Sequence, residues 1–318
     1  MKQKHHEPRW FGYAQSIRPA LIGVVAGLAL SASGQILAAS EPTAAQQANQ
    51  AQDIPTGQLP RFVTPSHYDL HLTIDPRKEG FSGEVTIDLD FNDSRDLFWI
   101  HGQAIEVDSI QLQPAKGRRI DASYEQVEST GVAQIKLDET YGPGAAQLVI
   151  KYHSNYNLAL EGLYKVDEAG ESYAFTQFEA ISARLAFPGF DQPDFKVPFD
   201  VRLTVPTGQV AIANTPATKE KDNGNGTSTV TFATSKPIPT YLVAFAVGPF
   251  DVVEAKDIPT SDYRDRTIPL RGIAVKGKGD KFEYALENTA SIVEALEGYF
   301  GIPYPYAKLD LIAVPDFN

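Results

Sequence analysis

Residues 67–75 read HYDLHLTID and residues 83–91 read GEVTIDLDF. In both stretches apolar side chains occupy every second position, namely Tyr68, Leu70, Leu72 and Ile74, and then Val85, Ile87, Leu89 and Phe91. Side chains of an extended strand point alternately to two faces. Both stretches therefore predict strands with one buried face and one polar face.

Similar short strand-like stretches continue to about residue 255. Short apolar or alternating runs recur at 97–100, 105–112, 132–137, 148–152, 201–205, 210–213, 229–232 and 241–247. Turn-forming residues separate them, most clearly in the run DNGNG at 222–226. Many short strands with such turns are typical of an antiparallel sandwich and not of alternating strands and helices. We predict a mainly β fold, an antiparallel β-sandwich, for this part of the chain.

A different unit is predicted after about residue 260. Residues 279–300 (GDKFEYALENTASIVEALEGYF) place apolar side chains on one helical stripe, at Phe282, Leu286, Val293, Leu296 and Phe300. Asp280 with Glu283 resembles a capping box at the start, and Gly301 is a typical stop. Strands are expected on either side, at 267–275 and 308–314. We expect this mixed α/β unit to be truncated, because about fifty-five residues are too few to bury a core of this kind.

Composition and charge exclude several classes of protein. The chain has 318 residues, of which 42% are hydrophobic and 21% charged, values typical of a globular protein. Its net charge of −12 argues against nucleic acid as a partner, because nucleic-acid binding needs a basic surface. Cysteine is absent, so disulfides, thiolate nucleophiles and zinc–thiolate sites are excluded within this sequence.

The first sixty residues predict a targeting segment followed by a linker. Four basic residues precede the apolar run ALIGVVAGLALSA at 20–32, and small residues follow as far as Ala39. This order is typical of a secretory signal peptide, residues 1–39, and cleavage there takes the net charge to about −15. The product would be exported, to the periplasm or the extracellular medium. An uncleaved membrane anchor is the alternative, although the apolar run is short for a span. Residues 40–60 contain almost no large apolar side chain and predict a disordered linker.

Motifs for metal and phosphate chemistry are missing from the sequence. It contains no HExxH, no GxxxxGK[ST] and no GxSxG. Its six histidines are scattered, and His67 and His71 lie four apart on a predicted strand, where that spacing does not bring side chains together. We therefore assign no metal ligand and no catalytic residue within this chain.

One segment is not a routine strand and turn. Residues 173–196 read YAFTQFEAISARLAFPGFDQPDFK. Gln177 and Glu179 are two apart, so on a strand they share a face, and a carboxylate beside a carboxamide can hold a ligand's ammonium group. The alternative is a solvated strand face with an ion pair between Arg184 and Asp191.

This segment also carries a family resemblance. The chain resembles the zinc-dependent aminopeptidases of the aminopeptidase N type, a thermolysin-like (gluzincin) family. The resemblance rests on TPSHYDLHLTID at 64–75, LEGLYK at 160–165, the segment 173–196, TYLVAFAVGPFDV at 240–252 and GIPYPYAKLDLIAVPDFN at 301–318. Gln192 and Gly189 depart from the family pattern, which more often has Glu and Cys there.

The resemblance implies an architecture. Residues 61–257 would be a saddle-like N-terminal β-sandwich domain, and residues 258–318 the beginning of a truncated thermolysin-like catalytic domain. In the family, the zinc ligands lie on an HExxH helix and a later glutamate. Here they would lie beyond Asn318, so the chain alone is expected neither to hold zinc nor to hydrolyse peptides.

The resemblance also implies a function. The chain would be the N-terminal part of a secreted zinc aminopeptidase that removes N-terminal residues from peptides. Glu179 would bind the substrate's free α-ammonium group and Gln177 would line the pocket for the first side chain. A catalytically inactive relative that acts as an exported peptide- or protein-binding module is the alternative. A leukotriene-hydrolase-like branch is a third possibility, but that branch has TQxQ where this chain has Glu179.

Overall fold

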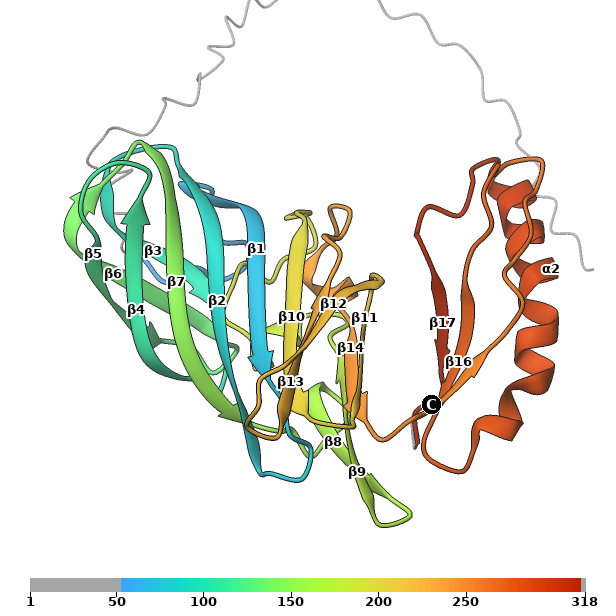
Figure 1. Ribbon diagram of the computed structural model, residues 1–318. Helices are drawn as coiled ribbons and strands as arrows, with labels where there is room; N and C mark the ends of the chain where they lie inside the picture. The colour runs from blue at the N-terminus through green and yellow to red at the C-terminus, as the bar shows by residue number, and fades with distance from the viewer. Residues whose placement is uncertain (1–52, 316–318) are drawn as a thin grey trace, which may run out of the picture. The chain divides into compact units, whose positions relative to one another are not determined.

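The computed structural model describes residues 53–315, and every structural statement below refers to them (Figure 1). The predicted signal peptide and most of the predicted linker lie outside the described residues. Leu59, near the end of the predicted linker, is already buried, and its backbone N–H donates a hydrogen bond to the side chain of Gln192. The packed part of the chain therefore begins slightly before residue 61.

The largest of the three sheets has ten strands. In the order in which they lie side by side, they are β12 (Ala217–Asp222), β13 (Thr227–Phe232), β10 (Phe199–Pro206), β1 (Val63–Thr73), β2 (Gly80–Phe91), β7 (Gly144–Asn155), β4 (Glu106–Pro114), β5 (Ile120–Gln126), β6 (Val132–Tyr141) and β3 (Arg95–His101). The alternating stretches at 67–75 and 83–91 fall in β1 and β2, which pair antiparallel with Tyr68 opposite Ile87. Their alternating apolar side chains are buried, as predicted.

One pairing in this sheet departs from the antiparallel prediction. β1 and β10 are parallel, with Tyr68 opposite Phe199 and Leu72 opposite Leu203. Parallel neighbours need a long connection, and here the connection contains all the strands from β2 to β9. The remaining pairings of the ten strands within the described residues are antiparallel.

The second sheet has four strands and packs against the first to form the predicted sandwich. Its order is β11 (Val210–Ala213), β14 (Phe245–Gly248), β9 (Glu171–Gln177) and β8 (Gly162–Glu168). Its inner face contributes Ala174, Phe245 and Val247 to the main hydrophobic core. Its outer face contributes Tyr173 and Phe175 to a second cluster. Because both faces are covered, all four residues of β14 are buried.

The third sheet and the helix α2 (Glu283–Phe300) form the mixed α/β unit predicted for the C-terminal part of the chain. The sheet contains β15 (Asp251–Glu254), β16 (Leu270–Ala274) and β17 (Leu309–Ile312). β16 and β17 are parallel and are connected through α2. Ile273 and Val275 pack into the same cluster as Tyr173 and Phe175, so this unit covers the outer face of the four-stranded sheet.

The start of the helix differs from the prediction. Residues Gly279–Phe282 form a 3₁₀ turn, η3, and neither Asp280 nor Glu283 makes a capping hydrogen bond from its side chain. Asp251 of β15 takes that role, because its Oδ2 accepts hydrogen bonds from the backbone N–H groups of Gly277 and Gly279 at 2.8 and 3.1 Å. The predicted stop is confirmed: Gly301 has φ 68° and donates its N–H to the carbonyl of Glu297.

The predicted apolar stripe is only half buried. Phe282 and Val293 are buried, whereas Leu296 and Phe300 are 50% and 64% exposed. The strand predicted at 241–247 is also shorter than expected, since Thr240–Leu242 is a 3₁₀ turn, η2, and β14 begins only at Phe245.

Candidate functional site

The two predicted site residues lie at the end of β9. Gln177 is the last residue of that strand, is half-buried and lies opposite Gly162 of β8. Glu179 follows two residues later in a turn and is exposed. The premise that both side chains belong to one strand is therefore wrong for Glu179, because the strand ends before it. Proximity in the chain still keeps the two residues together.

Gln177 projects toward the outer face of the four-stranded sheet. Tyr173 and Phe175, four and two residues earlier on β9, are buried in the outer cluster. Side chains two apart on a strand share a face, so the carboxamide of Gln177 continues that row. Glu179 lies just beyond it, and its carboxylate forms no ion pair or hydrogen bond within residues 53–315.

The turn that carries Glu179 is fixed at both ends. Phe178 is buried and packs edge-to-face against Phe187 and Phe245. Ser182 donates its backbone N–H to the carbonyl of Phe178 at 2.8 Å, and its hydroxyl to Oε1 of Glu161 at 2.7 Å. A surface carboxylate on so constrained a turn is presented at a defined position.

A buried ion pair supports the segment that follows. The side chains of Arg184 and Asp191 are 7% and 3% exposed, and their Nε and Oδ2 atoms are 2.9 Å apart. Arg184 also donates to the carbonyls of Thr130 and Asp191, and Thr240 donates its hydroxyl to Asp191 at 2.5 Å. The ion pair considered from the sequence thus forms, but in the interior. Such a pair needs further hydrogen bonds to offset the cost of desolvation, and these contacts supply them.

A neutral histidine completes this support. Nδ1 of His101 accepts a hydrogen bond from the backbone N–H of Asp191 at 3.2 Å, and His101 exchanges backbone hydrogen bonds with Gly189. Burial, with a smaller effect of the Arg184 charge, lowers the pKa of His101 to about 3. Sequence reasoning assigned His101 no role, because only the folded chain brings it to this segment.

The two departures from the family pattern both lie in this supporting segment. A Cβ atom at Gly189 would meet the hydroxyl of Tyr68 at 2.8 Å, so the residue is tightly enclosed. Gln192 is buried and accepts the N–H of Leu59. Both residues are buried, and they support the segment from within, Gly189 by close packing and Gln192 by hydrogen bonding.

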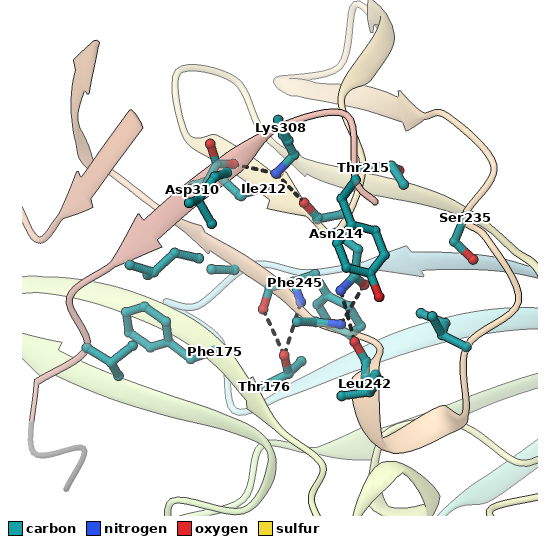
Figure 2. A pocket seen from close by; sticks show the side chains of 18 of the residues that line it. Phe175, Thr176, Ile212, Asn214, Thr215, Ser235, Leu242, Phe245, Lys308 and Asp310 are labelled. Atoms are coloured by element: carbon teal, nitrogen blue, oxygen red, sulfur yellow. Dashed lines mark hydrogen bonds and ion pairs between the residues drawn. The ribbon is translucent and has the colours of Figure 1, made fainter. Parts of the chain in front are cut away.

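A cavity of about 430 Å³ lies further along the same outer face (Figure 2). Phe175 and Thr176 form part of its wall, directly before Gln177. Asn214 bridges the wall, since its side chain donates to the carbonyl of Leu242 and accepts the N–H of Ala244. Sequence reasoning missed this cavity.

A charged group closes one side of the cavity. Figure 2 shows Lys308 beside Asp310, to which it is hydrogen-bonded. The Nζ of Lys308 also donates to the carbonyl oxygen of Ala213 at 2.7 Å. Asp310 also receives two hydrogen bonds from the guanidinium of Arg271, at 2.8 and 2.7 Å. Burial raises the pKa of Asp310, but these two cations outweigh it and hold the pKa below its ordinary value.

The described residues do not provide a zinc site. Between residues 53 and 315, no three side chains of the ligand-forming types lie close enough to hold a metal ion. His67 lies between Asp88 and Asp200, with its two ring nitrogens directed at different carboxylates, so the ring separates the acids. His153 lies between Glu106 and Asp108 in the same way. We assign no chemical step to a metal in this part of the chain.

No helix among residues 53–315 is both long enough and apolar enough to cross a bilayer.

Comparison with known proteins identifies the family. A family model described as the Peptidase M1 N-terminal domain matches residues 64–242. The chain is 34% identical over 270 residues to the puromycin-sensitive aminopeptidase of Caenorhabditis elegans, covering 82% of this chain and 28% of that protein. It is 31% identical over 271 residues to glutamyl aminopeptidase of Bos taurus, covering 82% and 28%, respectively.

A bacterial relative is shorter. Aminopeptidase N of Acetobacter pasteurianus is 29% identical over 264 residues, covering 81% of this chain and 71% of that protein. Against the first relatives, by contrast, the chain spans only 28% to 31% of their length. The fold and these matches confirm the resemblance deduced from the sequence, and the chain belongs to the M1 aminopeptidase family, of which it contains the N-terminal domain.

Proposed function

We propose that this chain is the N-terminal part of an exported zinc aminopeptidase, in which Glu179 binds the α-ammonium group of a peptide and Gln177 contacts its first side chain. The single observation that carries the proposal is the exposed carboxylate of Glu179 on a fixed turn, with no partner within residues 53–315. A carboxylate held in place can select a free N-terminus from an internal peptide bond. Peptides with a free N-terminus are the proposed substrates.

The names of the relatives support an aminopeptidase activity for the whole polypeptide. Zinc enters the proposal as the cofactor of the family, and no residue between 53 and 315 is assigned to it. Export rests on the sequence of residues 1–39. N-terminal sequencing of the secreted or periplasmic protein tests it, and a mature chain that still begins at residue 1 would contradict cleavage.

The test of Glu179 uses the polypeptide expressed from its complete reading frame. Glu179→Gln preserves the shape of the side chain and removes its charge. Loss of one partner from a desolvated charge pair costs about 2–5 kcal/mol. We therefore expect kcat/KM on an aminoacyl anilide to fall by about 1.5 to 3.5 powers of ten.

Glu168→Gln is the matched control. Glu168 ends β8 at the other end of the same hairpin, opposite Glu171, so its change should leave kcat/KM within about twofold. Circular dichroism confirms that both variants fold. A change smaller than about threefold in folded Glu179→Gln would remove this residue from the site. Peptide binding without turnover in the wild type would favour the binding-module alternative.

A further inference from the structure

The cavity on the outer face of the four-stranded sheet has an apolar interior. Its walls include Phe175, Ile212, Phe245 and Ala246, which also form the two hydrophobic clusters on either side of this sheet. An engineered protein cavity of about 150 Å³ can bind benzene. At about 430 Å³, this cavity can hold a body larger than one aromatic ring.

Most polar atoms of the interior are bonded within the protein, although the buried hydroxyl of Tyr164, which lines the cavity, has no hydrogen-bond partner within residues 53–315. Asn214 is bonded on both sides of its amide, and the hydroxyl of Thr176 accepts the N–H of Phe245 at 3.0 Å. Lys308 and Asp310 are paired with each other, so they add no net charge to the interior. The interior therefore favours an apolar group over a charged one.

The mouth of the cavity, unlike its apolar interior, is positively charged. A shallower groove of about 620 Å³ shares Asn214, Thr215, Lys236 and Tyr306 with the cavity and adds Arg266. Lys236 and Arg266 are exposed and form no salt bridge with a carboxylate within residues 53–315. The guanidinium of Arg266 is held in place by the carbonyls of Tyr304 and Tyr306, at 3.0 and 2.7 Å.

Among the residues that line the cavity and groove, the charged ones are Lys236, Arg266, Lys308 and Asp310. This is a local excess of positive charge in a chain whose net charge is −12. Two carboxylates border the groove through residues that line it: Asp257 accepts a hydrogen bond from Thr267 at 3.1 Å, and Asp200 accepts one from Thr234 at 2.5 Å. An apolar chamber with a cationic mouth matches one kind of molecule, which has an apolar body and an anionic end.

We propose that this cavity is a binding site for an amphipathic carboxylate, with the apolar body beside Phe175 and Ile212 and the carboxylate at Lys236 and Arg266. The site is separate from the Glu179 carboxylate, which favours a cation. It does not depend on the proposed peptidase activity. Small-molecule sites of this size are commonly apolar with a few placed polar groups.

The test measures binding of octanoate to the purified chain by isothermal titration calorimetry. Octanol and octyltrimethylammonium are the comparison probes, each with an unbranched alkyl chain of similar length to that of octanoate. Octanol is uncharged, and octyltrimethylammonium carries a positive charge. We expect octanoate to bind at least about tenfold more tightly than the cation and about threefold more tightly than the alcohol, since each exposed charge contributes modestly. Equal affinities for the three probes would overturn the assignment of a carboxylate.

Two kinds of variant locate the site. Lys236→Glu reverses a charge at the mouth and should weaken octanoate about tenfold, whereas Lys219→Glu, on the exposed strand β12, should change it less than twofold. Ala244→Phe places a ring in the cavity from an exposed position and should abolish binding. Should that variant not fold by thermal melting, Leu242→Trp fills the same space from a residue that is 44% exposed. Octanoate binding that survives a folded plug variant would overturn the proposal.

Discussion

The neutral state of His101 makes the stability of the sandwich depend on pH above the range in which carboxylates titrate. His101 is 3% exposed, and burial, followed by the nearby Arg184, lowers its pKa from 6.5 to about 3. The unfolded chain takes up a proton on this residue below about pH 6.5, and the folded chain does not. Stability from His101 is therefore complete above pH 6.5 and is lost as the pH falls from 6.5 towards 3.

The size of the effect follows from the difference in pKa. Each pH unit below 6.5 costs about 1.4 kcal/mol until the folded state itself is protonated. Between pH 7.5 and pH 5.0, His101 should remove about 2 kcal/mol from the free energy of unfolding. That is a large fraction of the stability of an ordinary domain.

The assay compares the wild type with His101→Asn. The amide oxygen of asparagine can replace Nδ1 as acceptor for the N–H of Asp191, but it does not titrate near neutral pH. Urea unfolding is followed by the fluorescence of Trp99, which is buried two residues away. The difference between the two proteins is what counts, because burial also lowers the pKa of His71. Parallel stability curves for the two proteins from pH 7.5 to 5.0 would refute the reasoning.

Two further predictions concern packing. Arg184→Ala should lower the free energy of unfolding by about 3–5 kcal/mol, because Asp191 then keeps a buried charge without its cation; a loss below about 1 kcal/mol in urea unfolding would mean that the pair is solvated. In α2, Val293→Ala should cost about 1–2 kcal/mol and Leu296→Ala less than about 0.5 kcal/mol, since the first side chain is buried and the second is half exposed. Equal losses in thermal or urea unfolding would contradict the burial of Val293.

The fold class could be predicted because residues 68–73 of β1 and 84–91 of β2 alternate between buried and more exposed positions. β12 could not be recognised in this way: its sequence ATKEKD is exposed at every position, and it is a strand only because its backbone pairs with β13. The parallel pairing of β1 with β10 likewise has no local signal. The start of α2 was misjudged because its cap, Asp251, belongs to a strand that precedes it by about thirty residues.

The candidate site, too, has one part that the sequence predicts and one part that it does not. The segment containing Gln177 and Glu179 was recognisable because its motif is continuous in the sequence. The cavity was not, since its walls come from separated segments around residues 175, 213, 245 and 309 that meet only after folding. His101 and Thr240 were missed for the same reason, although both contact Asp191.

The parallel pairing of β1 with β10 also affects the order in which the sheet can be completed during synthesis. His71 of β1 and its neighbour Thr204 of β10 are 133 residues apart. At about 5–20 residues per second, roughly 7 to 27 s separate the emergence of the two strands from the ribosome. During that interval β1 can pair with β2, but its other side is an open edge able to accept a foreign strand. A nascent chain that folds during synthesis would therefore expose this edge of β1 until β10 arrives, and a pause in translation before residue 199 would lengthen that exposure.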